Sequence, residues 1–155
     1  MYILPYHLLF LFFEHNNHKG KYDYIIEQIF LCALQPRMRQ KYVWKMTQLL
    51  SDYLKLVGLL FNCEFEISSP FGGSIKEYEQ LFHKAFVFNS ISLAENSIAS
   101  RANTELFFEF QKNHQNLVNL YHFEGIICSG CMNTVSNKFL EIESVLNGSR
   151  NTDFS

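Results

Sequence analysis

Apolar residues recur along this chain mostly at steps of three and four, the spacing that places them on one face of a helix. The clearest case is the segment 43–61, in which lysine, glutamine and aspartate fall on the opposite side. Residues 3–15 form an earlier apolar stretch. A second helix is expected from Asp23, a capping residue, to Pro36, because proline cannot continue a helix.

Two capping boxes strengthen the helical prediction. The sequences "SIKE" at 74–77 and "SLAE" at 92–95 each allow a serine and a glutamate to satisfy each other's backbone amides at a helix start. A further helix is expected from Asn103 or Thr104, and a last one over 129–146.

These patterns together predict an all-α fold. We expect a compact bundle of five to seven helices that forms a single domain over residues 1–155, which also fits a segment of a longer polypeptide. The 48% hydrophobic content indicates a packed core.

The charge and the chain ends narrow the classes of function. A formal net charge of −2 makes nucleic acid an unlikely partner, since it produces no strong positive field. The apolar start has neither a basic leader nor enough length to span a membrane, so we predict no signal peptide and no transmembrane helix. The expected location is intracellular, cytoplasmic or nuclear.

Cys128 and Cys131 form the one pattern that is typical of metal chemistry. Two thiolates two residues apart can bind one soft ion, and Gly125, Ile126 and both cysteines follow the order of a metal-binding loop. The stretch 119–155 therefore resembles the first half of a heavy-metal-associated, copper-chaperone-like domain. That resemblance implies Cu or Zn at the two cysteines.

The same cysteines also fit a structural interpretation without metal. They continue one helical stripe with apolar residues that follow at three- and four-residue steps, namely Val135, Phe139, Ile142 and Leu146. In this preferred interpretation the thiols are part of the core and no cofactor is bound.

A basic cluster is the first candidate binding surface. It contains Arg37, Arg39, Lys41 and Lys45, with Trp44 among them, and suits an acidic protein surface or a lone phosphate group better than a long duplex. A solvated helix face is the alternative.

The sequence "ELFFEF" supplies a second candidate surface. Phe107, Phe108 and Phe110 span more than half of a helical wheel, so at least one is expected to be exposed unless another chain covers it. A protein partner or a homo-oligomer would supply that cover.

Sequence motifs for catalysis are scarce. There is no nucleophile elbow, no phosphate-cradling glycine loop and no His-Glu-x-x-His. Arg150-Asn151 resembles the opening of the HEPN ribonuclease motif, which implies a remote alternative as a helical ribonuclease. The favoured prediction is a non-enzymatic interaction or regulatory module with an aromatic-rich surface, and the alternative is a thiol metal-binding protein.

Overall fold

The computed structural model describes residues 13, 19–63, 65, 70–119 and 128–141 of the chain. The chain divides into two units, Met1–Asn119 and Leu120–Ser155. The first unit contains a sheet with helices, and the described part of the second contains helix α5 (Ser129–Leu140). Within the described residues no helix is long and apolar enough to cross a membrane.

Four strands form a mixed sheet in the order β1-β2-β4-β3. Their bounds are Tyr22–Gln28 for β1, Leu50–Phe61 for β2, Phe86–Leu93 for β3 and Glu105–Lys112 for β4. Strand β1 runs parallel to β2, whereas β4 is antiparallel to both β2 and β3. A parallel pair cannot be joined by a hairpin, which explains why helices lie between β1 and β2 in the chain.

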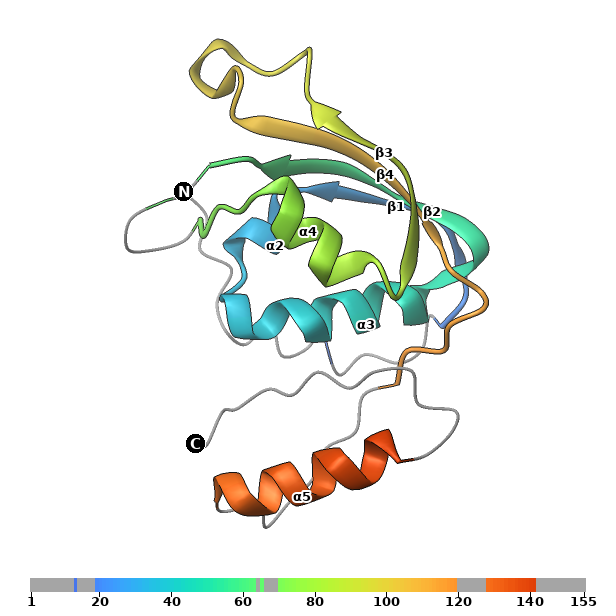
Figure 1. The fold of residues 1–155 in the computed structure, drawn as a ribbon. Helices are drawn as coiled ribbons and strands as arrows, with labels where there is room; N and C mark the ends of the chain where they lie inside the picture. The colour runs from blue at the N-terminus through green and yellow to red at the C-terminus, as the bar shows by residue number, and fades with distance from the viewer. Residues whose placement is uncertain (1–12, 14–18, 64, 66–69, 120–127, 142–155) are drawn as a thin grey trace. The chain divides into compact units, whose positions relative to one another are not determined.

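The helices of this unit lie on one side of the sheet (Figure 1). The chain passes from β1 to β2 through α2 (Phe30–Ala33), the 3-10 turn η1 (Pro36–Met38) and α3 (Arg39–Leu49). Helix α4 (Ile75–Phe82) leads from β2 to β3, and η2 (Ala99–Arg101) lies between β3 and β4. The β1–α3–β2 crossover is the unit from which doubly wound α/β folds are built.

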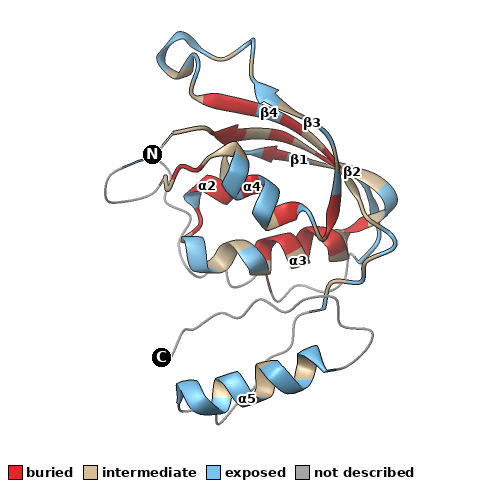
Figure 2. Ribbon diagram, in the orientation of Figure 1, coloured by how far each residue is buried: buried red, intermediate tan, exposed pale blue. Residues whose placement is uncertain are grey.

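The core lies between the sheet and these helices, as the buried segments in Figure 2 show. Alternate residues of the central strands point into it, because side chains in a strand alternate between faces. The fully buried members on these two strands are Leu50, Leu56 and Leu60 of β2 and Leu106, Phe108 and Phe110 of β4. Tyr42 and Met46 of α3 and Tyr78 and Phe82 of α4 cover them from the helical side.

The opposite face of the sheet keeps large apolar side chains at the surface. The exposed fractions are 61% for Tyr24, 84% for Ile26 and 43% for Phe107. The strand register places Ile26 beside Val57, and Leu59 beside Phe107, so these side chains form one continuous strip. Among the described residues of the unit Met1–Asn119, no helix covers this strip, although parallel strands are normally covered on both faces.

Glycine is required where the two parallel strands approach each other most closely. A Cβ atom added at Gly58 of β2 would lie 1.9 Å from the carbonyl oxygen of Glu27 in β1. Only a residue without a side chain fits there, so Gly58 fixes the approach of β2 to the end of β1.

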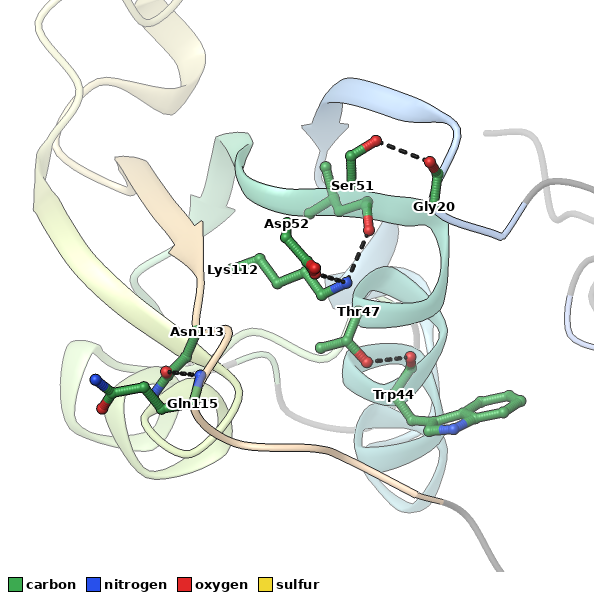
Figure 3. A network of polar contacts seen from close by, with 9 residues as sticks. Gly20, Trp44, Thr47, Ser51, Asp52, Lys112, Asn113 and Gln115 are labelled. Atoms are coloured by element: carbon green, nitrogen blue, oxygen red, sulfur yellow. Dashed lines mark hydrogen bonds and ion pairs between the residues drawn. The ribbon is translucent and has the colours of Figure 1, made fainter.

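Polar contacts hold the start of β2 at the other end of the sheet (Figure 3). The Lys112 Nζ at the end of β4 contacts Asp52 Oδ1 and the Leu50 carbonyl, both at 2.9 Å. The ion pair lowers the pKa of the exposed Asp52 carboxyl. The Ser51 hydroxyl donates to the Gly20 carbonyl at 2.8 Å, which ties the approach to β1 to the same region.

The all-α prediction is wrong. The segment 43–61 is the end of α3 followed by the whole of β2, and the expected helix from Asp23 is β1 followed by α2. The sequence "ELFFEF" forms β4, whose residues alternate between core and surface. Apolar residues are so frequent in these runs that they recur at even spacings as well as at spacings of three and four. An apolar-rich strand therefore resembles a helix in sequence.

Local capping signals gave mixed results. The first box is confirmed: the Ser74 hydroxyl accepts from the Glu77 amide and the Glu77 carboxylate accepts from the Ser74 amide at the start of α4. The second is wrong, because Ser92 lies in β3. The last helix begins at Ser129 as expected and ends at Leu140, and residues beyond 141 lie outside the described part.

Candidate active site at the carboxyl ends of the parallel strands

The carboxyl ends of the parallel strands β1 and β2 lie at one edge of the sheet. Glu27, near the end of β1, is the most constrained polar side chain of this edge. It is 4% exposed, and one carboxylate oxygen accepts from the backbone amides of Phe30 and Leu31, the latter at 3.1 Å. The other oxygen accepts from the Tyr42 hydroxyl of α3. Burial is the main cause that raises the pKa of the Glu27 carboxyl, and the three hydrogen bonds oppose it.

The turn after β1 is strained. Ile29 has φ 63, a left-handed conformation that costs a β-branched residue about 1–3 kcal/mol. Its amide donates to the Leu59 carbonyl of β2 at 3.0 Å. The hydrogen bonds to Glu27 and β2 therefore hold a backbone shape that Ile29 alone would avoid, and they place Phe30 at the edge.

Arg39 holds the loop that follows β2 against the same edge. Its Nη2 donates to the carbonyls of Phe71 and Gly72 at 2.9 and 2.8 Å. The Phe71 amide in turn donates to the Cys32 carbonyl of α2 at 2.6 Å. The loop 70–73 is thus fixed beside α2 by both its amide and its carbonyl groups.

A buried tyrosine lies on the core side of this region, between the end of β2 and α2. The Tyr78 hydroxyl donates to the Phe61 carbonyl at 2.7 Å and lies 3.5 Å from Cys32 Sγ, which accepts from the Phe61 amide. Burial is the first cause that raises the pKa of the Cys32 thiol and of the Tyr78 hydroxyl. Both groups are therefore neutral near pH 7 and serve to position the end of β2.

The predicted basic cluster does not form one patch. Arg39 binds the loop carbonyls, Lys45 is 2% exposed with its Nζ 3.3 Å from the Phe13 carbonyl, and Lys41 Nζ lies 5.1 Å from the centre of the Phe13 ring. Arg37 is exposed and its Nε donates to the Gln35 side chain at 2.7 Å. Trp44 is half-buried on α3.

The three phenylalanines of β4 are separated by the pleat of the strand. Phe108 and Phe110 lie fully buried in the core, and Phe107 alone reaches the open face. Only Phe107 is therefore placed where another chain could contact it.

Cys128 and Cys131 lie together and exposed at the start of α5, with 3.0 Å between their Sγ atoms. Among the described residues no group of three or more histidine, cysteine or acidic side chains forms a metal site. The stretch 120–127 and the residues after 141 lie outside the described part, and so do Arg150 and Asn151.

Solved structures identify the class of fold. A SAM-dependent methyltransferase of Methanosarcina mazei matches with a TM-score of 0.53 and 13% identity, over 65% of this chain and 64% of that one. The 1,6-didemethyltoxoflavin-N1-methyltransferase of Burkholderia thailandensis, solved with its ligand and S-adenosylhomocysteine, matches with a TM-score of 0.54 and 12% identity. That match covers 65% of this chain and 48% of the other. The sheet and its helices therefore have a Rossmann-like methyltransferase fold.

The family follows from the sequence. The model of the thiopurine S-methyltransferase family matches residues 9–119, which is well over half of the chain, and the chain belongs to that family. No curated protein sequence matches the chain. The chain spans about half to two thirds of the length of the two methyltransferases above, 48% and 64%.

These findings correct the functional predictions. The family is one of enzymes, so the interpretation as a non-enzymatic interaction module is wrong. The resemblance of 119–155 to a heavy-metal-associated domain is also wrong, as are the metal-binding function and the ribonuclease drawn from short patterns, because the matched family and fold are those of methyltransferases. Short cysteine and Arg-Asn patterns occur in many unrelated sequences.

Of the residues that form this edge, only Arg39 stands out in the sequence, as a member of the basic cluster. A usable signal was Glu27 directly after the apolar run "YII", since an acidic residue at the end of a strand often marks a ligand edge. The apolar spacing of this segment also predicts a helix, and that prediction conceals the signal.

Proposed function

We propose that the protein acts in methyl transfer from S-adenosylmethionine (SAM) to a small acceptor, and that this chain forms the acceptor side of the active site. The family match over residues 9–119 is the observation that carries the proposal. The matched region includes the carboxyl ends of β1 and β2, the edge at which doubly wound α/β folds bind their ligands.

An aromatic heterocyclic thiol is the acceptor class that the family description supports. Phe30 and Phe71 lie partly buried at the edge, and aromatic faces bind flat ring systems by stacking. Glu27 acts as a positioning residue, because both of its oxygens are engaged by the turn and by Tyr42.

The residues of this chain do not fit SAM by themselves. A cofactor with a ribose and an adenine needs a glycine-rich turn for close backbone approach and an acidic partner for the ribose. The seven glycines of the chain include no Gly-x-Gly, and Ile29 occupies the turn after β1. The amides at the start of α2 donate to Glu27, and α4 is capped by its own Ser74 and Glu77.

We therefore place the SAM-binding part in an α/β unit that pairs with β1 along the side on which no described strand lies. Such a unit adds a parallel strand beside β1, and its helices cover the strip that contains Tyr24, Ile26 and Phe107. A second copy of this chain, paired edge to edge through β1, would supply hydrogen-bond partners for the β1 backbone. It would, however, leave the strip uncovered. The unmatched length of the related methyltransferases is consistent with such a unit.

The test compares the protein isolated under mild conditions from its natural source with the isolated 155-residue chain. Transfer of a labelled methyl group from SAM to 6-mercaptopurine and to a panel of aromatic thiols is measured. We expect transfer by the native assembly and none by the isolated chain. No transfer by the native assembly would overturn the methyltransferase proposal, and transfer by the isolated chain would overturn the external SAM site alone.

A matched pair of variants tests the position of that unit. Ile26→Lys places a charge on the open strip and is expected to lower transfer by at least about tenfold, about 1.4 kcal/mol of binding. Ile98→Lys, at another highly exposed isoleucine outside the strands, should leave transfer within about twofold. Equal effects of the two would reject β1 as the docking edge.

A further inference from the structure

The two cysteines at the start of α5 form a compact pair whose role the proposed methyl transfer does not explain. Cys128 is the residue that caps the helix, and its Sγ accepts from the Cys131 amide at 3.3 Å. The two Sγ atoms are 3.0 Å apart, and both side chains are exposed. A covalent disulfide has an S–S length of about 2.05 Å, so a shift of about 1 Å joins them.

The surroundings distinguish the two sulfurs. The Cys131 thiol, followed by the Cys131 amide, lowers the pKa of Cys128, whereas the hydrogen bond and charge of Cys128 raise the pKa of Cys131. The first turn of α5 contains no acidic side chain that would oppose a thiolate. A thiolate at a helix start with a second thiol behind it has the features of an attacking and a resolving cysteine.

Metal binding is less well supported at this position. Two sulfurs supply half of a tetrahedral set, and within residues 128–141 and the rest of the described chain no third ligand completes the group. Disulfide formation needs only the two thiols and an oxidant.

We propose that Cys128 and Cys131 are a redox-active dithiol that exchanges with a small-molecule disulfide of the glutathione class. The Cys128 thiolate attacks one sulfur of the oxidised disulfide, a mixed disulfide forms, and one small thiolate leaves. Cys131, after losing its proton to solvent, attacks Cys128 Sγ and releases the second small thiolate. Two electrons pass from the protein to the small disulfide, and the two thiol protons end on the two released thiols.

The spacing permits this product. Residues at positions i and i+3 of a helix have Cβ atoms about 5–6 Å apart, and a disulfide requires about 3.5–4.5 Å. The non-helical backbone of Cys128, with φ −147 and ψ 158, lets the first cysteine turn toward the second without unwinding α5.

The experiment incubates the full chain in buffers of graded reduced-to-oxidised glutathione ratio, followed by acid quenching, alkylation of free thiols and peptide mass analysis. We expect one intramolecular disulfide, between Cys128 and Cys131, with Cys32 and Cys63 alkylated at every ratio at which the protein remains folded. A dithiol that stays reduced across the whole range, or a disulfide in any other pair, would overturn the proposal.

Single variants test the order of attack. Cys131→Ser should accumulate a glutathione adduct at Cys128, because nothing resolves it, and should do so at least about tenfold faster than Cys128→Ser forms one at Cys131. Cys63→Ser is the control and should retain the 128–131 disulfide unchanged. Equal rates in the two variants would remove the distinction between attacking and resolving thiols and contradict the mechanism.

Discussion

The Tyr42 hydroxyl in α3 donates to the Glu27 carboxylate at the end of β1, and this contact joins the helical layer to the edge of the sheet. Glu27 also accepts from the first two amides of α2. One buried carboxylate therefore fixes a strand end, a strained turn and two helices.

Glu27→Ala should lower the free energy of unfolding by about 3 kcal/mol, because it leaves the buried Tyr42 hydroxyl and two amides without their acceptor. Tyr42→Phe should cost about 1–2 kcal/mol. Urea unfolding of both single variants and of the double variant should give a coupling free energy of about 1 kcal/mol between Glu27 and Tyr42. The exposed Glu79→Ala is the control, with an effect within about 0.5 kcal/mol.

The raised pKa of Glu27 predicts a pH dependence with a definite sign. Above the ordinary glutamate value of about 4.3 the unfolded chain loses this proton before the folded protein does. The folded state then binds more protons, so this group makes stability fall as pH rises toward its folded pKa and become level above it.

Urea unfolding of the native protein and of Glu27→Gln from pH 4 to 8 checks the sign. The stability of Glu27→Gln relative to the native protein should increase through the lower part of this range. The lowered pKa values of Asp52 and Glu109 act in the other direction, but both residues are present in the two proteins and cancel in the difference. A difference that does not change with pH would show that Glu27 titrates normally.

Gly58→Ala should destabilise the sheet by about 3 kcal/mol or more, since the added methyl group would overlap the Glu27 backbone. Thermal unfolding followed by circular dichroism measures the loss. Gly130→Ala is the matched control: its Cβ would lie 3.8 Å from Cys128 Sγ in ordinary contact, and alanine favours a helix over glycine. A Gly58→Ala protein as stable as the native one would contradict the close strand approach.

Arg39→Ala should release the loop 70–73 at a cost of about 2 kcal/mol, because it removes two charge-assisted hydrogen bonds. The amides of Phe71 and Gly73 should exchange their hydrogens at least about tenfold faster. Arg37→Ala, two residues earlier and exposed, should leave both rates unchanged. Unaltered exchange in Arg39→Ala would mean that the backbone contacts of the loop hold it without the guanidinium.

Local signals in the sequence predicted the helix starts better than the strands. The capping box at Ser74 is specific because it depends on two side chains in one turn. The strands β2 and β4 carry apolar residues on both faces at several positions, such as Val57, Leu59 and Phe107, so their alternation is weak. A strand pattern of this kind depends on what covers the second face, and that information lies outside the local sequence.

The candidate site was hidden for a related reason. Its residues, Glu27, Tyr42, Arg39 and Phe71, are distant in sequence and become neighbours only through the β1–α3–β2 crossover. The glycine-rich turn by which such folds are usually identified does not occur in the chain. The short cysteine motif was therefore the most visible chemistry, although the family match ends before it.

Equilibrium dialysis with labelled SAM tests the central claim most directly. We expect stoichiometric binding of SAM to the native assembly. We expect no saturable binding to the isolated 155-residue chain at SAM concentrations up to about 1 mM, a dissociation constant that corresponds to a binding free energy of about 4 kcal/mol. Micromolar binding of SAM by the isolated chain would contradict the account, because it would require a cofactor site that its glycines and capped helix starts do not provide.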